Sequence, residues 1–262
     1  MKTGILRWLL PVLAGLSGIA VWYGLRHIVG IPAWLLPVPH EILAALNNER
    51  ALLAGAAWRT TQSAILGFAA AALAGLGLSV LLGSSRMTRR ALYPYLLFLQ
   101  MTPVIVIAPL VILWVGRGTA SIVIVTFIVS FFPVVVNTTH GITSTDRNMM
   151  ELFTVWDATR WQRLFMLQLP FAAPFYFAGL RIAATLAPIG AIFGEYVTGS
   201  VSGGEGGLGF LTAVFNARQM RPELFAVGLA SCILGFVFLG VISLVNWLLL
   251  RRWHDSLGRA DS

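Results

Sequence analysis

The sequence predicts an all-α membrane protein that crosses the bilayer six times as a single polytopic domain, 1–262. Its 262 residues are 58% hydrophobic and 11% charged, whereas about 25% charged is typical of soluble domains. Apolar runs of about 20 residues recur, and each is long enough to cross roughly 30 Å of hydrocarbon. The six predicted spans are 5–24, 58–83, 91–115, 119–139, 171–197 and 224–250.

The segments that flank the first two spans have their own signals. No A-x-A-like cleavage site follows 5–24, and Trp22 and Tyr23 resemble interfacial anchors, so we expect a retained span and not a signal peptide. The second half of the proline-rich loop at 30–57 is expected to form a short interfacial helix.

Small side chains recur at every fourth position of the second span: Ser63, Gly67, Ala71, Gly75, Ser79 and Gly83. In lipid, such a stripe lets another helix approach closely. The pattern therefore predicts simple helix packing along this face.

The third span contains three prolines: Pro94, Pro103 and Pro109. An interior proline removes a backbone hydrogen bond, and the break persists in a membrane where neighbouring groups or a water-filled cavity satisfy the freed carbonyl groups. Two interpretations stay open. Either Gln100, Thr102 and the broken turn at Pro103 line a translocation path, or the span is a kinked packing helix.

A second stripe of small residues runs along the fifth span through Gly179, Ala183, Ala187 and Ala191, and its next member is Glu195. A carboxylate on a close-packed face of a span is costly. Glu195 should therefore lie near an interface, be paired or face water, and it is a further candidate for the path. Residues 198–222 are expected to form an outer loop with a flexible glycine-rich turn at 203–209.

The basic residues favour cytoplasmic N- and C-termini. With six spans, both termini lie on one side, and that side holds eleven of the basic residues against six on the other. Cytoplasmic loops carry the excess of Lys and Arg, so the bias places the polar segment at 140–170 in the cytoplasm as well. The net charge of +8 does not indicate nucleic-acid binding, because the arginines cluster at the ends of apolar segments.

The segment at 140–170, here called the insert, concentrates charge that the neighbouring spans lack. Six charged residues fall within eighteen positions, whereas 119–139 has none: Asp146, Arg147, Glu151, Asp157, Arg160 and Arg163. A structured polar segment in a membrane chain often binds a partner in the water. A solvated loop that only follows the charge rules of topology is the alternative.

Catalytic and metal-binding patterns are absent from the sequence. No G-x-x-x-x-G-K-[ST] phosphate loop and no H-E-x-x-H motif occur, the four histidines are scattered, and Cys232 is the single cysteine. No chain of carboxylates crosses the spans, as a proton- or sodium-coupled carrier would need. We therefore expect neither an enzyme nor a metal site, and no cofactor on this chain.

The insert resembles the EAA loop of ABC-importer permeases. Glu151, Leu167, Leu169 and Pro170 match that pattern in type and spacing. Leu152-Phe153 replaces the family's alanine pair, and Asp157 replaces its glycine. Asp tolerates a left-handed turn conformation, so a helix–turn–helix can survive there.

Two further segments resemble the nitrate/sulfonate/taurine-type branch of these permeases. They are QMTPVIVIAPLVILWVGRG, at Gln100–Gly118, and LPFAAPFYFAGLRIAATLAPIGAIFGEYV, at Leu169–Val197. Within the branch they look most like permeases for thiamine-precursor (hydroxymethylpyrimidine) compounds or riboflavin. An oxyanion importer for alkanesulfonate, taurine or nitrate is the alternative substrate class, and an ion-coupled secondary transporter is the alternative mechanism.

The resemblance implies a type I ABC-importer permease in the bacterial cytoplasmic membrane. Two copies would form the pathway, ATP and Mg²⁺ would bind a separate ATPase, and a periplasmic or lipid-anchored binding protein would deliver the solute. It also implies that Glu151 pairs with a basic residue of the ATPase and that Trp161 and Leu164 supply an apolar seat. The residues expected to couple to the ATPase are Glu151, Asp157, Ala158, Thr159, Arg160, Trp161, Leu164 and Pro170.

Overall fold

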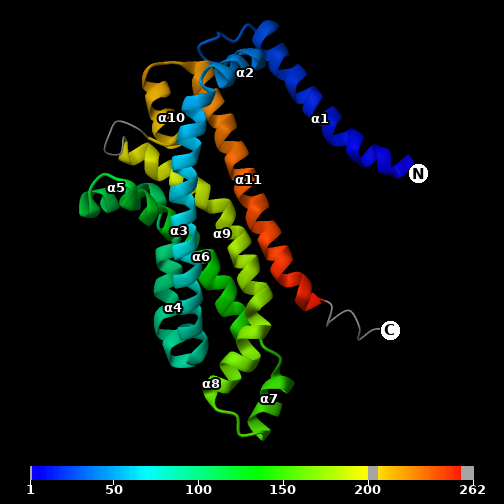
Figure 1. Ribbon diagram of the computed structural model, residues 1–262, viewed down its shortest axis with the longest axis vertical. Coiled ribbons are helices and arrows are strands. Elements are labelled where there is room, and N and C mark those ends of the chain that lie inside the picture. Colours follow the sequence, from blue (N-terminus) through cyan, green and yellow to red (C-terminus); the bar gives the residue numbers. More distant parts are fainter. Residues whose placement is uncertain (1, 200–205, 255–262) are drawn as a thin grey trace.

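The computed structural model describes residues 2–199 and 206–254, and within these ranges it contains helices and no strand (Figure 1). Five of the described helices are long and apolar enough to cross a membrane, and a bent helix pair brings the number to six. The five are α1 (Lys2–His27), α3 (Arg50–Ser84), α6 (Thr119–Thr143), α9 (Leu169–Thr198) and α11 (Arg221–His254). The predicted all-α architecture is confirmed.

The centre of the bundle is α6, with α3 on one side and α9 on another. Added Cβ atoms on Gly67, Gly75 and Gly83 would meet Thr126, Val134 and Ile142 in turn, so α3 and α6 run parallel. The stripe of small residues on α3 is therefore a helix-packing surface, as predicted.

Glycines also bring α9 against α6. A Cβ on Gly179 would lie 3.0 Å from the Pro133 carbonyl oxygen, and one on Gly190 would lie 3.0 Å from the Cα of Thr126. A later residue of α9 thus contacts an earlier residue of α6, which means that the two helices are antiparallel. As a result, the insert lies at the same end of the bundle as the turn that joins α3 to α4.

The third predicted span, 91–115, is not one helix. It divides into α4 (Arg86–Met101) and α5 (Val104–Val115), which are inclined by 98° to each other. The break falls at Thr102 and Pro103, where both residues have extended backbone. The interpretation of this segment as one kinked packing helix is therefore wrong.

Two short helices lie at the other end of the bundle. α2 (Pro39–Asn48) confirms the helix expected after the proline-rich loop, although α3 then begins at Arg50 and not near 58. α10 (Leu208–Ala217) occupies much of 198–222, where only a loop was expected. The prediction of a glycine-rich turn falls partly on 203–205, outside the described residues.

The first span lies apart from the bundle. α1 projects away from the other helices in Figure 1, and none of the apolar part of this helix is buried. It is joined to the rest of the protein at one end, where the Trp22 indole nitrogen donates to the Pro37 carbonyl oxygen at 3.0 Å and the Trp22 ring lies 6.0 Å from that of Phe225 on α11. The remaining surface of α1 is available for lipid or a partner.

Candidate coupling insert and translocation path

The insert consists of two short helices, each with its own N-terminal cap. α7 (Arg147–Val155) begins after Asp146, whose carboxylate accepts from the amide nitrogens of Asn148 and Met149 at 2.7 and 3.2 Å. α8 (Arg160–Arg163) begins after Thr159 with a reciprocal capping box. There the Gln162 side chain accepts from the Thr159 amide at 2.8 Å. These caps satisfy amide groups that helix ends leave free, so the insert is ordered by its own residues.

The turn between α7 and α8 is closed by a residue in the left-handed region. Asp157 has a φ of 50°, and it occupies the position at which the family pattern has glycine. Only a few residue types other than glycine adopt this conformation readily, and Asp is one of them. The prediction that the helix–turn–helix survives Asp157 is confirmed.

The path of the chain from α8 into α9 includes a five-residue π-helical turn, η1 (Leu164–Gln168). Leu164 is 2% exposed and packs with Ile142 and Ala172 beneath the insert. The expectation that Leu164 contributes to an apolar seat for another protein is therefore corrected, because this side chain belongs to the core. Pro170 also has a structural place, in the first turn of α9.

The exposed apolar side chains of the insert lie elsewhere. Trp161 is 63% exposed and stacks on Phe165, with ring centroids 5.9 Å apart. Met166 follows at 68% exposed, and Trp156 at 69% lies in the preceding turn. Exposed apolar side chains gathered in this way are typical of surfaces that contact another protein or a membrane, so they make the insert a candidate contact surface.

Glu151 lies on the exposed face of α7. Its carboxylate accepts from Arg147 Nε at 2.9 Å, and the two side chains remain 64% and 91% exposed. An ion pair with this exposure contributes little to stability, so Glu151 is free to exchange its partner.

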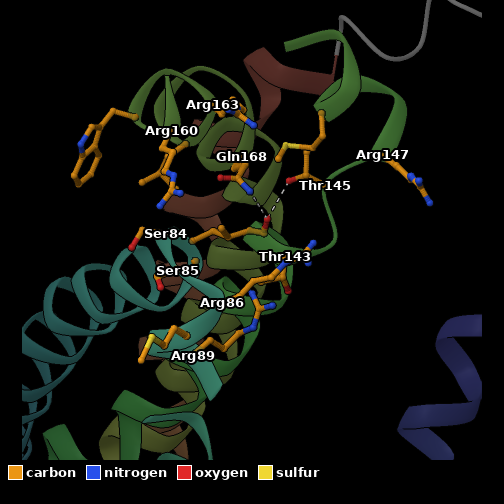
Figure 2. Close-up of a pocket in the computed structure, with 16 residues that line it drawn as sticks. Ser84, Ser85, Arg86, Arg89, Thr143, Thr145, Arg147, Arg160, Arg163 and Gln168 are labelled. Atoms are coloured by element: carbon orange, nitrogen blue, oxygen red, sulfur yellow. Dashed lines mark hydrogen bonds between the residues drawn. The ribbon is translucent and has the colours of Figure 1, made fainter. Parts of the chain in front are cut away.

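The remaining insert residues hold the turn together. The Ala158 carbonyl oxygen accepts from Arg163 Nε at 3.1 Å, and the Gln168 side chain donates to the Ile142 carbonyl oxygen at 3.4 Å. Arg160 is exposed and extends toward the turn between α3 and α4 (Figure 2). The insert is thus fixed to the end of α6 below it.

The candidate path residues of the third span lie together at the break between α4 and α5. Gln100 and Pro103 are exposed, and Thr102 is half-buried. None of the residues of α4 is buried within the protomer, whereas α5 packs on α6 through Ala108 and Val111. The break therefore presents an amide, a hydroxyl and a proline at an unpacked surface.

Glu195 lies in a different environment from these residues. It is 2% exposed, and Oε2 accepts from the Thr60 hydroxyl at 2.8 Å and from the Gly209 amide at 3.0 Å. Of the three environments expected for this carboxylate, near an interface, paired or facing water, the structure shows a paired one, and its partners are neutral hydrogen-bond donors. Phe193 and Val197, on the other side of α9, face the α5 cluster, so the structure does not bring Glu195 to the break.

Sequence reasoning missed the partners of Glu195. The Thr60 hydroxyl also accepts from the Leu208 amide at 2.9 Å, which joins α3 to the first turn of α10. A Cβ on Gly207 would run into the Glu195 carboxylate, and one on Gly209 into the Ile192 carbonyl oxygen. The available signal was the Gly-Leu-Gly run at 207–209, because only glycine allows a helix terminus to approach so closely.

A helical bundle with several apolar helices long enough to span a membrane, and with a capped, exposed insert between two of them, is the arrangement expected of a membrane transport subunit. The comparison with protein families agrees. Residues 61–259 match the family described as "Binding-protein-dependent transport system inner membrane component". The chain belongs to this family and is the membrane-spanning permease subunit of an ABC importer.

Curated relatives cover nearly the whole chain. The formylaminopyrimidine transport permease ThiX of Halalkalibacterium halodurans is 34% identical over 92% of this chain and 95% of its own length. The riboflavin transport system permease RibX of Chloroflexus aurantiacus is 35% identical over 90% and 86%. A putative aliphatic sulfonates transport permease of Bacillus subtilis, SsuC, is 28% identical over 95% and 89%. The predicted branch of the family is therefore confirmed.

A solved structure shows the same fold. A chain of the MetNI methionine ABC transporter, in an inward-facing conformation, superposes with a TM-score of 0.59 at 16% identity. The alignment covers 76% of this chain and 98% of the other. The type I importer permease fold expected from the sequence is thus confirmed.

Proposed function

We propose that this permease imports a small flat nitrogen heterocycle of the thiamine-precursor pyrimidine or riboflavin type. The observation that carries the proposal is the identity to ThiX and RibX, 34% and 35%, against 28% for SsuC and 27% for a nitrate import permease. The break between α4 and α5 fits such a solute, because its polar groups, from Gln100 and Thr102, are uncharged.

The insert is proposed as the element that receives the mechanical input. In this mechanism α7 and α8 seat in a groove of the ATPase, Trp161 and Phe165 supply apolar contact, and Glu151 pairs with a basic residue. A buried aromatic contact gives affinity and a charge pair fixes register. ATP-driven closure of two ATPases would then draw two inserts together and open the path outward, and hydrolysis would reverse the motion.

The proposed topology places both termini and the insert in the cytoplasm. One support is the excess of basic residues on the side that holds both termini. The other is that α3 and α6 pack in parallel, so the insert lies at the same end of the bundle as the arginines that follow α3. A second copy is proposed to complete the path. The unpacked surface of α4 supports this, since a single protomer leaves the candidate path residues open on one side.

The test of the substrate class uses the cognate binding protein. Thermal-shift screening against a formylaminopyrimidine, riboflavin and an alkanesulfonate should show stabilisation by one of the two heterocycles. Uptake of that heterocycle into vesicles that contain permease, ATPase and binding protein should then require ATP. Stabilisation by the alkanesulfonate alone would replace the proposal with an oxyanion importer, and ion-driven uptake without the ATPase would contradict the mechanism.

A further inference from the structure

A cavity of about 1180 Å³ lies between the insert and the turn that joins α3 to α4 (Figure 2). The ends of α3 and α6, the start of α4, and α8 with η1 all contribute to its wall. Among the described residues that line it there is no carboxylate, but there are five arginines: Arg86, Arg89, Arg147, Arg160 and Arg163.

Three of these arginines are available to a ligand. Arg147 is paired with Glu151 and points away from the cavity in Figure 2, and Arg163 donates to the Ala158 carbonyl oxygen. For Arg86, Arg89 and Arg160, by contrast, no side-chain hydrogen bond or ion pair joins them to any other described residue. Like charges in one cavity repel one another, so the arrangement favours an anion between them.

The start of α4 adds neutral donors to the same wall. α4 has 16 residues, and its Ser85 cap accepts from the Thr88 amide at 3.3 Å. The first amide groups of the helix, at Arg86 and Met87, have no partner within the helix, and the helix dipole favours negative charge at this end. Arg160 reaches toward Ser84 and Ser85 from the opposite wall (Figure 2).

We propose that this cavity binds the phosphate of an anionic phospholipid, held by Arg86, Arg89 and Arg160. The cavity opens where α3 ends, at the edge of the membrane-spanning region. Met87 lines the cavity and is 83% exposed, so it gives an acyl chain an apolar contact beside the arginines. Basic pockets at the cytoplasmic ends of membrane helices bind anionic headgroups in this way.

The lipid would add a polar link between the start of α4 and the insert, beside the apolar contact that Val80 of α3 makes with the Leu164 cluster. Arg86 and Arg89 belong to the first turn of α4, whereas Arg160 belongs to the insert. A headgroup between them offsets their mutual repulsion and fixes the spacing of the insert from the membrane. The leaflet is the inner one if the proposed topology holds, but binding itself does not depend on that topology or on transport.

Native mass spectrometry of the full-length permease in detergent tests the site directly. Phosphatidylglycerol should bind saturably, whereas phosphatidylcholine should not. Each arginine should contribute about five-fold to affinity, so Arg86→Gln with Arg160→Gln should weaken binding roughly 25-fold. Arg90→Gln is the matched control, because Arg90 neighbours Arg89 on α4 and does not line the cavity.

Competition experiments separate the lipid from other sources of negative charge. Inorganic phosphate should displace phosphatidylglycerol only at a large excess, and phosphatidylglycerol should stay bound when the ATPase is added. Equal binding of the two lipids, or equal loss of binding in the Arg90→Gln control, would overturn the proposal. Displacement by the ATPase would also overturn it, because the arginines would then serve an acidic surface of that subunit.

Discussion

Glu151 and Glu195 lie at opposite ends of the antiparallel pair α6–α9, and they differ in almost every contact. Glu151 is exposed on a short helix and pairs only with its neighbour Arg147. Glu195 is buried and accepts hydrogen bonds from Thr60 on α3 and Gly209 on α10. One end of the permease therefore exposes its carboxylate, and the other end uses its carboxylate to hold three helices together.

The same contrast holds for the apolar side chains. Ala187 and Ala191 are fully buried in the core near Glu195, whereas Trp156, Trp161 and Met166 of the insert are mostly exposed. Large exposed apolar side chains of this kind are typical of surfaces that contact another protein or a membrane. The two ends of the permease therefore differ: the side chains near Glu195 are packed within the protomer, whereas those at the tip of the insert are exposed.

The largest expected effect follows from Glu151→Arg, which should abolish ATP-driven uptake while leaving membrane insertion intact. The carboxylate contributes little inside the permease, because an exposed pair at this spacing is worth about 0.3–0.5 kcal/mol. Uptake and ATPase co-purification are measured together. Arg147→Ala removes the same internal pair and should retain uptake; equal loss in both variants, or normal behaviour of Glu151→Arg, would contradict the assignment.

A second contrast separates the two faces of the insert. Leu164→Ala should destabilise the permease by about 2–5 kcal/mol, because it leaves a cavity between the insert and the core. Trp161→Ala should leave the thermal transition unchanged and weaken ATPase binding by about 2 kcal/mol, or roughly 30-fold. Thermal denaturation and an ATPase-binding titration are run on each variant. A loss of stability in Trp161→Ala but not in Leu164→Ala would contradict the assignment of Leu164 to the core and of Trp161 to the contact surface.

The Glu195 end is tested by Gly209→Ala, which places a methyl group against the Ile192 carbonyl oxygen. The first turn of α10 must then move, and overpacking of this kind costs about 1–3 kcal/mol. Gly235→Ala is the matched control, since a Cβ on that glycine meets nothing within 4 Å. A thermal transition lowered equally in both variants would argue against close packing at this end.

The smallest effect is expected at Asp157. Asp157→Gly should raise stability slightly or leave it unchanged, because glycine adopts a positive φ at no steric cost. Asp157→Val should lower stability by about 1–2 kcal/mol, since a β-branched residue resists the left-handed region. Thermal denaturation of the two variants checks this order, and a more stable Asp157→Val would show that the turn adopts another conformation in solution.

Local patterns in the sequence were sufficient for the spans and for the design of the insert. Runs of apolar residues located α3, α6, α9 and α11, and the four-residue spacing of small side chains located the faces of α3 and α9 that pack. The family pattern located the insert, and the known tolerance of Asp for a left-handed turn predicted the conformation of Asp157.

Contacts between distant segments could not be predicted in the same way. A buried carboxylate at Glu195 needs hydrogen-bond donors, but no local pattern in the sequence indicated that Thr60 and α10 provide them. Thr60 lies more than a hundred positions before Glu195 in the sequence. Leu164 was expected at the partner surface only because the family resemblance implies a seat there, whereas in the structure it lies in the η1 turn and packs into the core with Ile142 and Ala172. The proline pattern indicated a break in 91–115 but not its angle of 98°.

The central claim is that the insert faces the cytoplasm and contacts the ATPase there. Cysteines placed at Thr159 and at Gln162, in a Cys232→Ser background, report this with a membrane-impermeant thiol reagent. The account predicts labelling in inverted vesicles, none in right-side-out vesicles, and protection when the ATPase is bound. Labelling from the outside of intact cells would place the insert on the other side of the membrane and contradict the account.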